Sequence, residues 1–193
     1  MDTEDFEEGF TALSGQLLVA SPKLVEDANF GKTVVLMVQH NDEGAFGLVL
    51  NRPDRAPLRE IWDKVADTEC SSSQCLHVGG PVPGPLMVLH THEALSELEV
   101  VEGVFLSVRR ENIEQIVETD EDSFRVFLGY SGWAPGQLES ELSQQAWLTA
   151  EATSSHVFEC DEDLWERVAR EIVSKAIPSR LIGKHVPPDP SLN

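Results

Sequence analysis

The chain has 193 residues, enough for one domain, and 41% of them are apolar, which suffices for a sizeable core. Asp and Glu number 34 against 14 Lys and Arg, so the formal net charge at pH 7 is −20. A charge of this sign repels nucleic-acid phosphates and anionic lipid surfaces, and it argues against direct binding to either.

The two ends of the chain differ in composition from the middle. Five of the first eight residues are acidic, which excludes a secretory signal, because such a signal needs a positive region before its apolar stretch. No apolar run approaches the roughly 20 residues that a helix needs to cross a bilayer. We therefore expect a cytoplasmic protein with an acidic flexible N-terminus over residues 1–9, one domain over 10–177 and a proline-rich tail over 178–193.

Short apolar runs predict the strands. Residues 33–39 (TVVLMVQ) and 45–50 (AFGLVL) are typical of strands that are buried on both faces. Residues 40–44 contain Asn, Asp and Gly between these runs, and they predict a hairpin turn. The other runs expected to form strands are residues 17–20, 75–78, 86–90, 104–108 and 124–128.

Helical spacing of apolar residues falls between the strands. Pro57 suits a first helical position before an amphipathic segment that reaches residue 65. A shorter helix is expected around residues 113–117, another from Gln137, and a last one between a cap at Asp161 and a stop at Pro178. Strands come in runs interrupted by single helices, which predicts an α+β domain with a mostly antiparallel or mixed sheet and helices packed outside.

Three cysteines, Cys70, Cys75 and Cys160, are odd in number and have no Cys-x-x-Cys spacing. Reduced thiols are the expected state in a reducing compartment. The alternative is a redox switch between Cys70 and Cys75, since serines 71–73 predict a polar, exposed loop between them.

Three segments combine turn or loop residues with groups that can bind a ligand. In the first, His40 precedes the predicted hairpin turn and Asn51 and Arg52 follow its second strand. The turn lies at the end of the hairpin away from Asn51, so His40 and Asn51 need not meet. A hairpin turn and a strand terminus explain these residues equally well.

The second segment, residues 77–82 (HVGGPV), follows a predicted strand. His77 precedes Gly79, Gly80 and Pro81, and paired glycines allow close backbone approach or an anion-binding nest of N–H groups. The spacing fits neither a Walker A loop nor a dinucleotide fingerprint. A tight turn between two strands is the alternative interpretation.

The third segment, residues 129–139 (GYSGWAPGQLE), is expected to be a glycine-rich loop with a type II turn at Pro135 and Gly136. Tyr130 and Trp133 form either an aromatic pocket wall or a plug that docks the loop on the core. Ser131 lacks the glycine two residues later that a nucleophile elbow requires.

We expect residues 129–137 and 77–81 to lie side by side and to form one concave binding surface, with Arg52 as an added cation. His90 and His92 share one face of a predicted strand, but a metal site needs more convergent ligands than the sequence shows, and strand-end histidines are the preferred interpretation. The sequence predicts no catalytic residue, metal or cofactor. The expected binding residues are His40, Asn51, Arg52, His77, Gly79, Gly80, Pro81, Tyr130, Ser131, Trp133 and Gln137.

The same segments resemble the YqgE/AlgH-like family. The matching blocks occur in family order over residues 13–173 and include GQLLVASP at 15–22, HNDEGAFGLVLNRP at 40–53, GGPV at 79–82 and GYSGW at 129–133. The resemblance implies a bifurcated sheet folded into a pseudo-barrel. For the member AlgH, a role in regulating alginate production has been proposed. The resemblance implies no established catalytic residues or cofactor.

These observations favour a non-catalytic binding or regulatory protein that recognises a protein or a small ligand. The missing catalytic constellation and the glycine and aromatic residues of the third segment support this interpretation. The alternative is a hydrolase-like enzyme, with or without a metal, that uses His40, His77 or His90 together with Arg52. No helix-turn-helix signal supports direct DNA binding.

Overall fold

The computed structural model describes residues 12–119, 123–159 and 163–176, apart from residues 67, 69, 71 and 73. The expected tails over residues 1–9 and 178–193 lie outside this part, as do the cap at Asp161 and the stop at Pro178.

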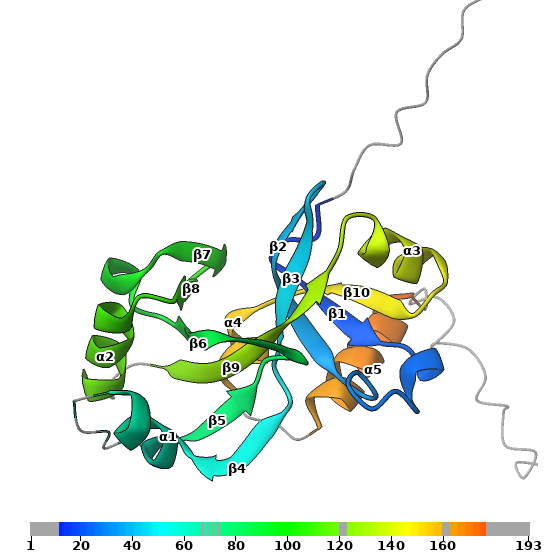
Figure 1. Cartoon of the computed structure of the whole chain (residues 1–193). Coiled ribbons are helices and arrows are strands. Elements are labelled where there is room, and N and C mark those ends of the chain that lie inside the picture. The colour runs from blue at the N-terminus through cyan, green and yellow to red at the C-terminus, as the bar shows by residue number, and fades with distance from the viewer. Residues whose placement is uncertain are drawn as a thin grey trace, which may run out of the picture.

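The strands form one curled sheet of the half-barrel type (Figure 1). Its main path runs in the order β10-β1-β2-β3-β9-β6-β8-β7, and β5 joins β9 to β4 beside that path. Neighbouring strands are antiparallel except β5 and β9, which are parallel among the described residues. The bounds are β1 (Gln16–Ala20), β2 (Val34–Asn41), β3 (Gly44–Val49), β4 (Pro53–Pro57), β5 (Cys75–Val78), β6 (Val82–His90), β7 (Leu98–Val101), β8 (Val104–Ser107), β9 (Phe124–Trp133) and β10 (Trp147–Glu151).

Helices cover the outside of the sheet. Figure 1 shows α1 and α2 beside the part of the sheet that contains β4 to β8, and α3 and α5 beside the part that contains β1 and β10. The predicted α+β class and the curled, mostly antiparallel sheet are confirmed. None of the described helices is both long and apolar enough to cross a membrane. Their bounds are α1 (Leu58–Val65), α2 (Arg110–Thr119), α3 (Gln137–Ser143), α4 (Ser154–Phe158) and α5 (Leu164–Ala176), with 3-10 turns at Pro22–Leu24 and Glu93–Leu95.

Strand β9 is the element at which the sheet divides. Its last residues pair with β3, with Gly47 opposite Ser131, while its first residues pair with β6 on one edge and with β5 on the other. Gly129 has a φ of +71° and interrupts the alternation of side chains along the strand. As a result Phe127 and Tyr130, three residues apart, pack against the same core cluster.

The prediction that residues 129–133 form a loop is wrong, because β9 continues through them to Trp133. Two glycines and a serine hide the alternation that normally marks a strand, and pairing with β3 supplies the missing stabilisation. The hairpin prediction is confirmed, with β2 and β3 joined at residues 42 and 43 and with Gly44 at a φ of +130°.

Candidate binding site

The two glycine-rich segments come together in the structure. The Gly79 N–H donates to the Leu128 carbonyl at 3.0 Å, and the Ser131 hydroxyl donates to the Gly79 carbonyl at 3.3 Å. A Cβ at Gly80 would collide with the backbone of Tyr130 and Ser131. The glycines therefore serve packing of backbone on backbone, and Ser131, with no exposed surface, is sealed inside this contact.

Trp133 points away from this contact into the core. Its indole is 5% exposed and lies 6.1 Å from the Phe30 ring and 6.0 Å from the Trp147 ring, centroid to centroid. Its indole N–H donates to Glu141 at 2.9 Å, and the Trp147 N–H donates to the same carboxylate oxygen at 2.8 Å. The Gln137 side chain donates to the other Glu141 oxygen at 2.9 Å, so Gln137 positions the Glu141 carboxylate.

Tyr130 packs against a different core cluster from Trp133 and lines an open groove of about 390 Å³, which Trp133 also borders. Its ring packs edge-on against Phe46, with 6.1 Å between the centroids. Met87, 4% exposed, is the most buried of the lining side chains. The phenol makes no hydrogen bond within the part of the chain that the structure describes, so its hydroxyl is available to a ligand.

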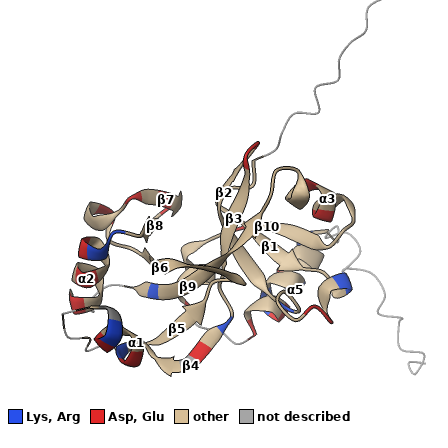
Figure 2. Ribbon diagram, viewed as in Figure 1, with Lys and Arg blue, Asp and Glu red and all other residues tan. Residues whose placement is uncertain are grey.

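The rim of the groove is polar and acidic. Gln39, Asn41 and Glu43 line it from the β2–β3 hairpin, and Pro85 lines it from β6. Figure 2 shows acidic residues at the tip of this hairpin. An apolar floor with an acceptor-rich rim is a combination that suits an apolar group flanked by hydrogen-bond donors or cations.

His40 is a structural link between three segments. It is buried, its Nδ1 accepts from the Leu13 N–H at 3.2 Å, and its Nε2 lies 2.9 Å from a Glu139 oxygen. Because Nδ1 accepts, the proton of the neutral ring is on Nε2, which donates to Glu139.

Asn51 and Arg52 are not part of the groove. The Asn51 side chain accepts from the Val34 N–H at 2.9 Å and donates to the Lys32 carbonyl at 2.8 Å, which ties the end of β3 to the start of β2. Arg52 donates to the Gly31 carbonyl at 3.0 Å. The expected cation of the shared surface therefore supports the turn before β2 instead.

His77 occupies the middle of β5 and is 2% exposed. Neither of its ring nitrogens has a hydrogen-bond partner of good geometry within the described residues, although the Cys75 backbone lies near enough to influence the ring. Burial, reinforced by the nearby Arg125 guanidinium and opposed by the Cys75 backbone, lowers the pKa of His77 from 6.5 to about 4. At neutral pH the imidazole is therefore uncharged.

The remaining expected residues do not converge on one centre. Pro81 and Gln137 are exposed, and His90 is buried on β6 with its Nε2 2.9 Å from the Ser107 hydroxyl. Among the described residues no three His, Cys, Asp or Glu side chains form a group that could hold a metal ion.

The profile of the AlgH-like family matches residues 17–176, which is most of the chain. This chain belongs to the AlgH-like family. It is 37% identical over 163 residues to a UPF0301 protein of Chlorobaculum tepidum, covering 81% of this chain and 84% of that one. It is 38% identical over 170 residues to a UPF0301 protein of Xanthomonas oryzae pv. oryzae, covering 84% and 90%.

Two solved structures share the AlgH-like fold. The solution structure of AlgH from Pseudomonas aeruginosa matches with a TM-score of 0.71 and 30% identity, covering 93% of this chain and 99% of that one. A crystal structure of a protein from Corynebacterium diphtheriae has a TM-score of 0.66 at 24% identity, covering 91% and 92%, and shows the fold alone. The resemblance expected from the sequence is thus confirmed.

Two residues of this AlgH-like chain have clear structural roles that sequence patterns did not reveal, Arg125 and Glu141. Arg125 is 4% exposed and lies in an otherwise apolar stretch of β9, a pattern that is itself a signal for a special environment. The sequence around Glu141 gives no such signal, because an acid in a polar helix is normally exposed to solvent. Ser72 is buried, so the exposed loop expected over serines 71–73 is wrong at this position, and Cys70 is buried as well.

Proposed function

We propose that this AlgH-like chain is a non-catalytic binding protein that recognises a partner at the Tyr130 groove, the depression lined by Gln39, Asn41, Glu43, Phe46, Met87 and Tyr130. The observation that carries the proposal is the pairing of an aromatic wall with an unused phenol hydroxyl in a groove of about 390 Å³. Aromatic residues of this kind, apolar on the ring and polar at the tip, are enriched at recognition sites.

The partner is a protein segment that presents one apolar side chain flanked by Lys or Arg. The apolar side chain would lie between Phe46, Met87 and Tyr130, where it leaves water. Lys or Arg beside it would lie close to Glu43 and to the acidic hairpin tip, and the net charge of −20 favours approach of a cationic partner.

A displayed library of random peptides tests the proposal directly. The wild-type chain should enrich peptides that combine an aromatic or aliphatic anchor with flanking Lys or Arg. For the strongest peptide, Tyr130→Ala should weaken binding by about tenfold or more, because it removes the wall of the groove. Glu43→Gln should weaken binding less and should reduce its dependence on salt.

Leu128→Ala is the matched control. Leu128 is another residue of β9 with an exposed apolar side chain, 43% accessible, and it does not line the groove. It should leave peptide affinity unchanged. The proposal fails if no basic–apolar peptides are enriched, or if Tyr130→Ala and Leu128→Ala bind them equally well while both remain folded by circular dichroism.

A further inference from the structure

The chain itself contains a segment of the kind that the Tyr130 groove is proposed to recognise. Residues 180–184 read Arg-Leu-Ile-Gly-Lys, so two apolar residues, Leu181 and Ile182, stand between a basic residue on each side. No acid occurs among residues 172–188, although acids outnumber basic residues by 34 to 14 in the whole chain. The sequence therefore carries a basic–apolar segment in an otherwise strongly acidic protein.

The groove offers a counterpart to both features of this segment. Its apolar surface comes from Phe46, Met87 and Tyr130, and the two aromatic rings are only partly buried, so an apolar side chain can still reach them. Asp42 and Glu43 are exposed on the hairpin beside it and form no ion pair within the part of the chain that the structure describes. An apolar pair would leave water against the rings, and an adjacent basic residue would lie close to these two acids.

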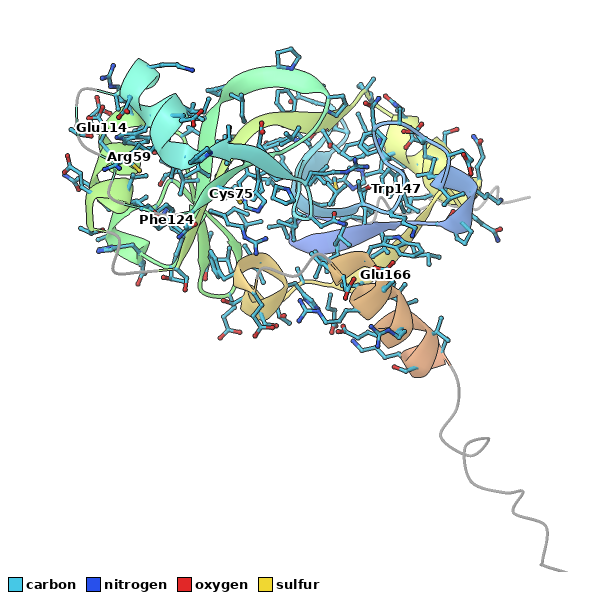
Figure 3. The ribbon with its side chains drawn as sticks, turned by 90° about the horizontal axis from the view of Figure 1, so that it is seen from below. Arg59, Cys75, Glu114, Phe124, Trp147 and Glu166 are labelled. Carbon is cyan, nitrogen blue, oxygen red and sulfur yellow. The ribbon has the colours of Figure 1, made fainter. Side chains whose placement is uncertain are left out.

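The end of α5 indicates which copy of the groove the segment reaches. Leu181 comes five residues after Ala176, the last residue of α5, and an extended chain spans that interval in at most about 18 Å. Ala176 borders a hollow between α5 and β10 that shares no lining residue with the Tyr130 groove. Figure 3, in which Glu166 marks the first turn of α5, shows this helix running outward from the rest of the domain. A short segment that starts at an outward-pointing helix end is directed at a neighbouring molecule.

We infer that residues 180–184 of one copy of the chain bind in the Tyr130 groove of a second copy. The inference rests on the proposed function and names its partner. Two copies that exchange these segments make the same contact twice, as a two-fold symmetric pair does. Once the first contact has formed, the second is intramolecular, so two weak contacts hold the pair together more tightly than either would alone.

The full-length chain tests this inference through its methionine methyl groups. Of the three methionines, Met87 lines the groove, whereas Met37 is fully buried in a different core cluster. A chain that carries Leu181→Ser and Ile182→Ser keeps the groove and loses the apolar part of the segment, and its methionines are labelled with carbon-13. Unlabelled wild type added to this chain should shift the Met87 signal saturably and leave the Met37 signal in place.

Three unlabelled partners serve as comparisons in the same titration. Leu192→Ser changes an apolar residue that has no basic neighbour, and it should act as the wild type does. A partner with Leu181→Ser and Ile182→Ser should cause no shift. A partner with Arg180→Glu and Lys184→Glu should bind at least about tenfold more weakly, because the acids of the hairpin then repel the segment.

An unchanged Met87 signal in the presence of wild type, or equal shifts with the wild type and with the Leu181→Ser, Ile182→Ser partner, would overturn the inference. A Met87 signal that differs between these two chains alone, but does not respond to an added partner, would overturn it as well, since the segment would then bind within its own chain. The strongest peptide of the displayed library separates the two proposals. If that peptide shifts Met87 and the wild type does not, the proposed function stands and this inference fails; if neither shifts it, both fail.

Discussion

The imidazole of His77 is neutral at pH 7 because burial and the Arg125 guanidinium lower its pKa to about 4, whereas the unfolded chain restores a value of 6.5. Between these two values the unfolded state binds more protons than the folded state. The free energy of unfolding that His77 contributes is therefore fully present above pH 6.5 and is lost as the pH falls towards 4. A difference of 2.5 pKa units corresponds to at most about 3 kcal/mol.

His77→Gln should remove this pH dependence. Carboxylates also titrate in the window, so the measurement is the difference between the wild type and the variant in urea unfolding at pH 7, 6, 5 and 4.5. The wild type should lose about 2 kcal/mol more than the variant over this range. His92→Gln keeps His77 in place and should retain the wild-type slope. Parallel curves for the wild type and His77→Gln would show that burial of the ring does not control its protonation.

At the scale of elements, Glu141 joins β9, α3 and β10. Its carboxylate accepts from Trp133 on β9 and from Trp147 on β10, while the side chain itself belongs to α3. One acid thus satisfies two largely buried indole N–H groups that would otherwise lose their bonds to water on folding.

Glu141→Ala should lower the free energy of unfolding by about 2–4 kcal/mol, because two indole donors are left without an acceptor. Glu141→Gln should cost less, since its amide oxygen can still accept. Chemical denaturation followed by tryptophan fluorescence measures both. The control is Glu118→Ala on α2, an exposed acid that should change stability by less than about 0.5 kcal/mol. Equal small effects at positions 118 and 141 would contradict the role of Glu141.

The elements that the sequence predicts best are those with strong local patterns. The hairpin of β2 and β3 and the helix Leu58–Val65 follow from apolar runs, turn residues and Pro57. Strands β4, β7 and β10 were missed, because they are short and carry polar residues on exposed faces. Pairing with strands distant in sequence stabilises β4 and β10, which no local pattern encodes, whereas β7 pairs with the next strand, β8.

The candidate site was likewise predictable only where a local sequence pattern marks it. The sequence correctly predicted that the two glycine-rich segments lie side by side, because the glycines at residues 79–80 allow close backbone approach. It did not show that Tyr130 and Trp133 pack against different core clusters, because residues 129–133 were expected to form a loop and not a strand with alternating side chains. Nor did it show that Arg125 and His77 share a cavity, which depends on the parallel pairing of β5 with β9.

At the scale of the whole molecule, charge controls what the surface can attract. Basic residues are spread over several elements with acidic residues nearby, as Figure 2 shows. Several of them are paired with acids: Lys32 with Glu166, Arg110 with Glu114, Arg167 with Glu159 and Lys175 with Glu151. No continuous basic face is therefore formed by these residues, and the proposed cationic partner is consistent with this distribution.

Duplex DNA should bind to the purified protein only weakly near physiological salt. Affinity for DNA comes largely from Lys and Arg that displace counterions from the phosphates, and here 34 acids oppose 14 basic residues. A gel-shift assay with pooled random duplexes measures this, and the salt slope should be shallow because few phosphates are neutralised. A basic protein of similar size serves as the positive control. Sub-micromolar, sequence-specific binding would contradict the expectation and would place a cationic surface on this chain that its charge distribution does not predict.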